Sequence, residues 1–294
     1  MPIRETAGDR IVRVIIYVIL SLTALACLYP LYVVLISSFS DPAAVASGKV
    51  TLFPVGITLD AYIEAFSTDE IVRGYCNSLL YTVVGTAINM FLTIPTAYAL
   101  SQPKVKGRSW IMKLFVFTMY FSGGLIPQFL LMKGLHLTNT VWAVLLMNGL
   151  SVTNLIIARS FFTSGIPREL EEAAEIDGCS PVQTFLKVVL PLSKAMLSVI
   201  LLYYAVARWN NYTSSLYYQP SASHLHSLQM ILRGFIERAN VSSLQGNEAA
   251  EYYASLVAQL KYSVIVIASV PLLILYPFIQ KYFEKGVMIG SVKG

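Results

Sequence analysis

Residues 167–191, PRELEEAAEIDGCSPVQTFLKVVLP, form a polar island between two hydrophobic segments that are each long enough to cross a membrane. Gly178 and the prolines at 167 and 181 mark turns within the island. Its charged residues are five acids and two bases: Glu169, Glu171, Glu172, Glu175 and Asp177, with Arg168 and Lys187. A loop that only connected two spans would not need these signals. The stretch therefore predicts a folded element outside the bilayer that docks on another protein.

The order of residues in this island predicts a helix, a sharp turn and a second helix. Pro167 suits the first turn of a helix, where its missing N–H is not needed. Gly178 predicts a left-handed end to that helix. Ser180 and Gln183 have the spacing of a capping box, with Pro181 at the first position of the second helix. The second helix continues into the next hydrophobic segment, so a push on the first helix would reach the membrane directly.

The first helix carries a narrow ridge of small apolar residues, Leu170, Ala173 and Ala174, flanked by acids. Such a ridge fits a groove on a partner protein, while the acids can meet basic groups at its rim. The alternative is an amphipathic helix lying on lipid. Its acids would then face an anionic inner leaflet, which is unfavourable. We therefore favour docking on a protein.

The composition excludes an ordinary soluble domain. The chain is 56% hydrophobic and 13% charged, with a mean hydropathy of +0.64, whereas soluble domains average about 25% charged residues. Six hydrophobic runs predict an all-α membrane protein with six transmembrane helices, in a single domain of residues 1–294. The N-terminal span lies at about 12–38 and the core spans at about 75–283. The runs are Val14–Ser40, Gly74–Pro103, Leu114–Met132, Gly134–Ala158, Val188–Ala207 and Tyr262–Gln280.

Lysine and arginine positions predict the orientation, because cytoplasmic loops carry an excess of them. Six spans place both termini on one side. The loop 102–109, QPKVKGRS, is short and purely basic, and it lies on the same side as the island. Both termini and the island are therefore predicted to be cytoplasmic. The net charge of +5 follows from this bias, so no nucleic-acid partner is needed to explain it.

Two long segments are predicted on the opposite side of the membrane. Residues 41–73 contain a turn-rich stretch and an amphipathic helix that begins at Asp60. Residues 209–261 contain two short helices, near 227–237 and 247–260. Loops of this length are usually functional. Ordered surface loops without partners are the alternative.

A set of polar residues within the spans is predicted to line a translocation path. The alternative is that they hold the helices together, since Ser, Thr and Asn also serve as contacts between transmembrane helices. The residues are Asn77, Ser78, Thr82, Asn89 and Asn148.

Catalytic motifs are absent from the sequence. No G-x4-G-K-[ST] motif occurs, so the chain lacks a phosphate-cradling loop. His224 and His226 have no third metal ligand nearby in sequence. No acid or base is expected at mid-membrane depth in any span, which disfavours an ion-coupled carrier and a membrane-embedded enzyme. We predict that the chain is not an enzyme and holds no metal or cofactor, so energy must come from a partner.

One motif within the island carries a family resemblance. Glu172-Ala173-Ala174, Gly178, Val188 and Leu190-Pro191 reproduce the pattern EAA-x3-G-x9-I-x-L-P, with Val188 in the place of Ile. This pattern resembles the signature of the membrane subunits of bacterial ABC importers. The closing QKYFEKGVMIGSVKG, residues 280–294, resembles the tail of maltose-type carbohydrate importer permeases. The resemblance covers essentially the whole chain and is closest to the branch that takes up oligosaccharides, including uronic-acid-containing ones.

The resemblance implies a permease subunit of an ATP-binding-cassette importer that moves an oligosaccharide into the cytoplasm. It implies that the first island helix sits in a cleft of a cytoplasmic ATPase, and that the C-terminal tail also reaches the ATPases. The implied coupling residues are Glu172, Ala173, Ala174, Asp177, Gly178 and Pro191. The implied tail contacts are Lys285, Gly286 and Gly290. ATP and Mg would be bound by the partner ATPase and no cofactor by this chain.

The resemblance also implies a set of partners. They are a homologous second permease in a heterodimer, two cytoplasmic ABC ATPase subunits, and an extracytoplasmic solute-binding protein. The last would dock on residues 41–73 and 209–261. The implied location is the bacterial plasma membrane, as a multi-pass protein in the lipid bilayer. An acidic sugar would favour basic residues near the external mouth, and four residues could serve: Arg208, Arg233, Arg238 and Lys261. These four are equally well explained as solvated charges of the loops. A non-sugar solute and ion-coupled transport stay as alternatives.

Overall fold

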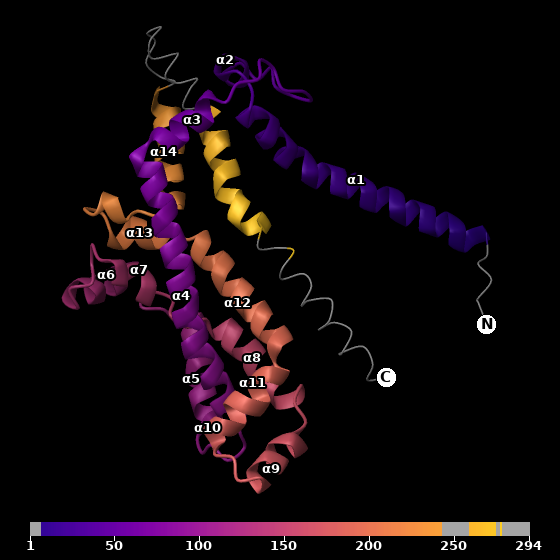
Figure 1. The fold of residues 1–294 in the computed structure, drawn as a ribbon, viewed down its shortest axis with the longest axis vertical. Helices are drawn as coiled ribbons and strands as arrows, with labels where there is room; N and C mark the ends of the chain where they lie inside the picture. Colours follow the sequence, from indigo (N-terminus) through magenta and orange to yellow (C-terminus); the bar gives the residue numbers. More distant parts are fainter. Residues whose placement is uncertain (1–6, 243–258, 275–276, 278–294) are drawn as a thin grey trace. The chain divides into compact units, whose positions relative to one another are not determined.

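The computed structural model describes residues 7–242, 259–274 and 277. Every regular element in this part of the chain is a helix (Figure 1). The predicted all-α class is therefore confirmed. The chain divides into two compact units, Met1–Thr68 with Leu232–Ser269, and Asp69–Ile231 with Val270–Gly294. The single transmembrane domain stays a prediction.

The first unit begins with a long apolar helix, α1 (Ala7–Ser38), whose large hydrophobic side chains are exposed along most of its length. Helices α2 (Pro42–Ala46) and α3 (Asp60–Ser67) follow. The helix predicted from Asp60 is confirmed. At the end of α1, Tyr62 donates to the Ser38 hydroxyl at 2.8 Å, and Gln259 donates to the Ser40 carbonyl at 2.7 Å. These bonds tie the end of α1 to α3 and to the helix Gln259–Ile274.

The second unit is built around α4 (Asp69–Ser101), which packs against α8 (Val152–Ser164) and α12 (Lys194–Trp209), as Figure 1 shows. Small residues allow the close approach of these helices, because Ala97 of α4 and Ala158 of α8 are fully buried at the contact. The core around them is apolar, and it includes Ile94, Leu155, Phe162, Val189 and Ile200. Pro95 lies inside α4.

Other helices of the second unit are shorter, and those of residues 167–192 are described with the site below. The others include α5 (Arg108–Tyr120), α6 (Leu125–Gly134), α7 (Val141–Leu146) and α13 (Thr213–Tyr218), with α14 (Leu228–Ser242) beginning in this unit. A small apolar cluster of Met132, Ala143 and Tyr218 joins α6, α7 and α13. Helix α14 confirms the helix predicted near 227–237 and is longer than expected. The helix predicted at 247–260 lies almost wholly outside the described residues.

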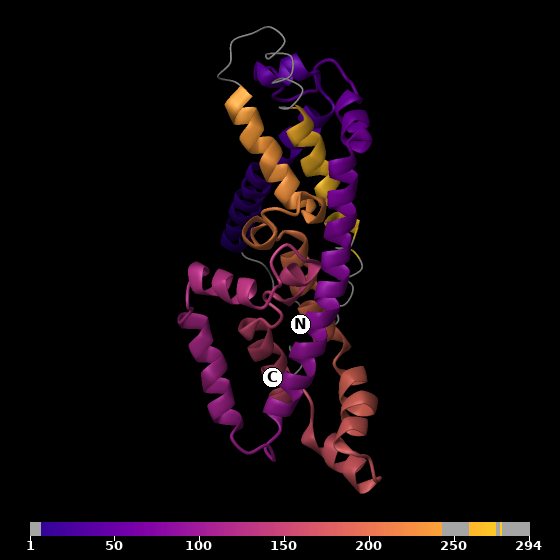
Figure 2. The ribbon, with the colours of Figure 1, turned by 90° about the vertical axis from the view of Figure 1, so that its left-hand side faces the viewer.

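The count of six spans is not confirmed. In the described part of the chain, two helices are long and apolar enough to cross a membrane, 8–38 and 69–101. Two bent pairs raise the number to four if each pair is one span. The predicted run 114–132 is bent by 113° between α5 and α6, which is visible in Figure 2. The run 134–158 is divided among α6, α7 and α8.

Candidate functional site

The island at 167–191 folds as a helix, a tight turn and a second helix. Helix α9 (Arg168–Ile176) begins directly after Pro167. Pro167 was predicted to lie in the first turn of this helix, but it is the N-cap residue. Gly178 has a φ of 83° and ends α9, as predicted. Its N–H donates to the Glu175 carbonyl at 3.0 Å, and the Cys179 N–H donates to the Ala174 carbonyl at 2.9 Å. This pair of bonds is a Schellman motif.

The second part of the island leads into α12 through an irregular segment. Helix α10 (Pro181–Thr184) starts with the predicted capping box between Ser180 and Gln183. A π-helical turn, η1 (Phe185–Val189), and the short α11 (Leu190–Leu192) come next. Pro191 is exposed within α11. The path then bends by 84° into α12. The predicted second helix therefore reaches the core, but through a sharp bend.

Helix α9 has one face toward its own chain and one face toward the outside. Ala174 is buried, whereas Glu172 and Ala173 are exposed. Ile176 lies at the end of the exposed face with 87% of its surface accessible. The predicted ridge is therefore wrong in part, because Ala174 packs inside the chain. Asp177 caps the helix end and is exposed.

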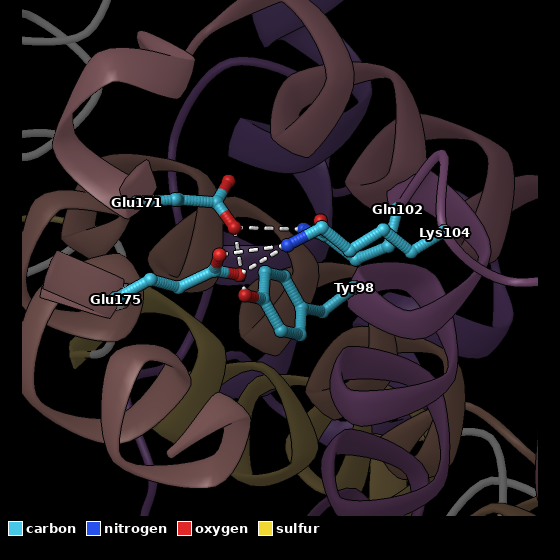
Figure 3. A network of polar contacts seen from close by, with 5 residues as sticks. All are labelled: Tyr98, Gln102, Lys104, Glu171 and Glu175. Carbon is cyan, nitrogen blue, oxygen red and sulfur yellow. Dashed lines mark hydrogen bonds and ion pairs between the residues drawn. The ribbon is translucent and has the colours of Figure 1, made fainter. Parts of the chain in front are cut away.

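Two acids of α9 hold it to the end of α4 and to the loop that follows (Figure 3). One Glu171 carboxylate oxygen accepts from the Tyr98 hydroxyl at 2.8 Å and from the Gln102 amide at 2.9 Å. Both Glu175 oxygens lie 2.7 Å from the Lys104 ammonium. We call Tyr98, Gln102, Lys104, Glu171 and Glu175 the anchor network. The acids of α9 were predicted to meet basic groups of a partner protein, but Glu171 and Glu175 bind residues of this chain instead.

Tyr98 connects the anchor network to the helical core. Its ring stacks on Phe185 of η1 at 4.8 Å between centroids, and it meets Phe162 of α8 edge-on at 5.8 Å. Such pairs contribute about 0.5–1.5 kcal/mol each beyond their burial. The Lys104–Glu175 pair is largely exposed, so it adds little by itself. Tyr98 is therefore the residue through which α4, α8, η1 and α9 meet.

We expect Tyr98→Phe to loosen α9 without disturbing the core, because it removes one hydroxyl and keeps the ring. A hydrogen bond to a partly exposed carboxylate is worth about 1 kcal/mol, so amide exchange in α9 should be about fivefold faster. Hydrogen exchange read by mass spectrometry on α9 peptides measures this. Tyr120→Phe, at an exposed tyrosine of α5, is the matched control. Unchanged α9 exchange would show that the anchor network does not hold the helix.

A polar cavity of about 450 Å³ lies beside the middle of α4. Its lining comes from α4, α8, α12 and the segments that follow α7 and α12. Most of the lining residues carry amide, hydroxyl or guanidinium groups. They are Asn89, Asn148, Leu150, Ser151, Asn154, Tyr203, Tyr204, Ala207, Arg208 and Asn211. We call this the polar cavity.

Arg208 is the central side chain of the polar cavity and is only 6% exposed. Its Nε donates to the Asn89 Oδ1 at 2.8 Å, and its Nη atoms donate to the carbonyls of Val144 at 2.6 Å and Leu145 at 3.0 Å. A longer bond of 3.4 Å reaches the Asn148 carbonyl. Val144 and Leu145 are in the last turn of α7, where the helix dipole favours a cation. The sequence placed Arg208 on the external side, as a base near the mouth or as a solvated loop charge, whereas it lies beside the middle of α4.

Asn89 completes the arrangement from the side of α4. It is fully buried, and its amide donates to the carbonyls of Asn148 and Gly149, each at 2.7 Å. One turn further along α4, Thr93 shares a hydrogen bond of 2.6 Å with Tyr204. Tyr204 and Arg208 are four residues apart and therefore lie on one face of α12. Of the predicted path residues, Asn89 and Asn148 meet here.

The other predicted path residues lie elsewhere on α4. Asn77 donates to the carbonyls of His224 and His226, at 2.9 and 3.0 Å. The Ser78 hydroxyl accepts from the Leu228 N–H at 2.8 Å. These two side chains hold the 223–228 segment and do not line the polar cavity. Thr82 is buried, and its hydroxyl oxygen has no hydrogen-bond partner among the residues that the structure describes. The predicted tail contacts Lys285, Gly286 and Gly290 lie outside the described residues.

Sequence reasoning did not assign the anchor network or the central position of Arg208. The sequence held a signal for Arg208, because this arginine directly follows the uncharged end of a predicted span. A charge at such a position is either solvated or part of a functional site within the membrane. No comparable signal marks Tyr98, since a tyrosine near the end of a span is common at membrane interfaces.

The fold and these two sites belong to a helical chain with apolar helices long enough to cross a membrane, and comparison with known proteins shows its family. A model of the family described as "binding-protein-dependent transport system inner membrane component" matches residues 71–289. The chain therefore belongs to this family of inner-membrane transport proteins. It is a multi-pass membrane protein and not an enzyme.

Individual relatives extend the similarity over nearly the whole chain. The polygalacturonan/rhamnogalacturonan transport system permease protein YtcP of Bacillus subtilis (strain 168) is 43% identical, over 97% of this chain and 99% of its own length. Protein LplC of the same organism is 41% identical, over 90% of this chain and 89% of its own. Both similarities run across the α9 and polar-cavity regions.

The fold of this chain is also similar to that of a solved structure. A chain from the crystal structure of a bacterial ABC transporter involved in the import of the acidic polysaccharide alginate matches with a TM-score of 0.84. It is 33% identical and the match covers 96% of this chain and 99% of that one. The predicted resemblance to carbohydrate importer permeases is therefore confirmed. Membership of the family implies that an ATPase and a solute-binding protein work with this chain.

Proposed function

We propose that this chain is one permease subunit of an ATP-driven importer that moves an oligosaccharide into the cytoplasm. The relatives support the substrate, because the names of YtcP and of the alginate transporter both refer to carbohydrate polymers. The polar cavity supports it too, since asparagine amides and tyrosine hydroxyls are suited to binding sugar hydroxyl groups.

The observation that carries the proposal is the two-sided construction of α9. Its inner side is bonded to α4 through Glu171, while Glu172, Ala173 and Ile176 are exposed. An apolar side chain as exposed as Ile176, next to an acid and an alanine, is suited to a groove on a partner. We assign this face to the cytoplasmic ATPase, which would move α9 during its cycle.

The inner side of α9 offers a route from that ATPase to the polar cavity. Tyr98 and Asn89 belong to the same helix and are nine residues apart, which is about 14 Å along an α-helix. A displacement of α9 would therefore reach Asn89 through α4. A second route runs through η1 and α11 into α12, which carries Arg208.

The partners follow from the same proposal. A second, homologous permease would complete a heterodimer, with two ATPase subunits on the cytoplasmic side. The binding protein would dock on residues 41–73 and 209–261. Both termini would be cytoplasmic, and Lys285, Gly286 and Gly290 would contact the ATPases. The Lys104–Glu175 pair supports the orientation, because it joins the basic loop to α9 at one end of the second unit.

Two alternatives have less support. An ion-coupled carrier usually needs buried carboxylates, and the buried polar residues of the described part of the chain include no Asp or Glu. A non-sugar solute would fit an importer of the same family. The sugar-like chemistry of the cavity and the names of the relatives favour an oligosaccharide.

Co-purification tests the assignment of α9. We expect the wild-type permease pair to retain its ATPase in detergent, and Glu172→Ala to reduce the retained amount at least tenfold while the permease stays in the membrane. Glu64→Ala removes an exposed acid of α3 and is the matched control. Full retention of the ATPase by the Glu172 variant, with substrate-stimulated hydrolysis intact, would show that α9 is not the docking element.

A further inference from the structure

Arg208 gives the polar cavity a positive charge that has no counter-ion among the described residues. None of the described residues brings a carboxylate into an ion pair with it, and the described cavity lining contains no Asp or Glu. Its bonds go to one amide oxygen and three carbonyl oxygens. These dipoles orient the guanidinium, but they do not neutralise it. Burying an unpaired charge is costly, so its retention calls for a reason.

The guanidinium is held rigidly where it borders the cavity. Four of its five N–H groups are engaged by Asn89, Val144, Leu145 and Asn148, which leaves one N–H of Nη1 unassigned. Gly85 of α4 allows this position, because a Cβ there would lie 2.9 Å from Arg208 Nε. An anion entering the cavity would meet a fixed charge that needs no reorganisation.

The cavity has the size and the lining of a small-molecule site. Its volume of about 450 Å³ falls within the range of about 300–1,000 Å³ that such sites occupy. Asn154, Ser151 and Tyr203 supply neutral hydrogen-bonding groups around the single cation. A neutral sugar would use the neutral groups alone. A sugar that also carries a carboxylate would gain the attraction of Arg208, which is stronger in a low-dielectric site than in water.

We propose that Arg208 is a specificity-determining residue that makes this permease prefer saccharides carrying a carboxylate group, such as uronic acid oligosaccharides. This inference rests on the proposed function, because it assumes that substrate passes the polar cavity. Arg208 also fastens the end of α7 to α4 and α12. A purely structural clamp would treat acidic and neutral sugars alike, and this difference provides the test.

The experiment compares each acidic sugar with its own neutral derivative. Oligogalacturonides and oligomannuronates are supplied as free acids and as methyl esters, which differ in charge but keep the ring hydroxyls. The complete complex in liposomes is assayed for the concentration that half-maximally stimulates ATP hydrolysis. For each protein, this half-maximal concentration for the methyl ester is divided by that for the free acid. The resulting ratio is then compared between the wild type and each variant. The same binding protein is present throughout, so a change in the ratio reports on the permease.

We expect the ratio to fall about tenfold in Arg208→Gln and to be largely kept in Arg208→Lys, which retains the charge. Asn148→Asp is a second variant that keeps the guanidinium and adds a negative charge to the cavity lining. Asparagine and aspartate both tolerate the left-handed backbone at this position, where φ is 55°. The ratio should fall in this variant as well, so the test does not depend on the folding of the Arg208 variants.

Three results would overturn the inference. In the first, Arg208→Gln and Asn148→Asp change the response to acid and ester by the same factor, which makes Arg208 a structural clamp only. In the second, the wild type responds equally to acid and ester. In the third, only a neutral oligosaccharide stimulates hydrolysis, which leaves the proposed function standing. Loss of the proposed function is distinguishable, because no ATPase would then associate with the permease or respond to any saccharide.

Discussion

Gly178→Val should release the ATPase from the permease and abolish transport. Gly178 has a φ of 83°, a conformation that costs a residue with a Cβ about 1–2 kcal/mol and a β-branched residue more. The strain is relieved if the Schellman bonds to Ala174 and Glu175 break and the last turn of α9 unwinds. The exposed face around Glu172 and Ile176 would then lose its geometry.

The measurement is the amount of ATPase that co-purifies with the permease. Substrate-stimulated ATP hydrolysis in liposomes is measured for Gly178→Val alone, because the control residue lies within 41–73, the proposed docking surface of the binding protein. Gly48→Val is a closely matched control. Gly48 has a φ of 68°, and the same pair of bonds ends α2: the Gly48 N–H donates to the Val45 carbonyl and the Lys49 N–H donates to the Ala44 carbonyl. The strain is thus reproduced far from α9 in the sequence. Equal retention of the ATPase by both variants would contradict the role given to the turn at Gly178.

Asn89→Leu should strongly destabilise the second unit. Leucine cannot accept from Arg208 or donate to the carbonyls of Asn148 and Gly149, so buried polar groups on both sides lose their partner. Each unsatisfied group costs about 1–3 kcal/mol, and the total loss should be at least about 3 kcal/mol. Thermal unfolding of the purified permease in detergent measures it.

Phe91→Leu provides the reference for Asn89→Leu, because it changes a residue of the same helix that is 76% exposed. We expect the midpoint of unfolding to fall by several degrees in Asn89→Leu and to stay almost unchanged in Phe91→Leu. Similar midpoints for the two variants would mean that the bonds around Arg208 contribute little to stability.

The parts of the fold that follow from local rules could be predicted from the sequence. The turn at Gly178 depends on one left-handed residue, and the capping box depends on Ser180 and Gln183, so each is specified within a few residues. The helical class follows equally directly, since a chain in lipid must satisfy its own backbone groups. The start of α3 at Asp60 belongs to the same group of predictions.

The count of spans could not be predicted reliably, because hydrophobicity does not register bends. The run 114–132 is uncharged throughout, yet the chain turns by 113° between Tyr120 and Leu125. A signal was present in Gly123 and Gly124, the latter with a φ of 85°. The bend after Leu192 has a comparable origin, since Pro191 cannot donate to the helical ladder.

The sites depend on contacts between residues far apart in sequence, which spacing alone does not specify. Glu171 and Glu175 were expected to face a partner, and only the position of α4 shows that they bind Tyr98 and Lys104. Arg208 was counted as external because α12 was assumed to cross fully. It instead ends beside Asn89, at the middle of α4.

Pro95 lies in α4 between Asn89, which lines the polar cavity, and Tyr98, which belongs to the anchor network. A proline inside a helix removes the hydrogen bond to the carbonyl four residues earlier, here that of Phe91. The Thr96 hydroxyl binds the neighbouring Leu92 carbonyl at 2.6 Å. The hydrogen-bond ladder of α4 is therefore interrupted between Asn89 and Tyr98, although the helix continues through Pro95. Under the proposed function, a displacement of α9 would pass this weaker turn on its way to Asn89, so part of the movement would be taken up by bending of α4 at Pro95.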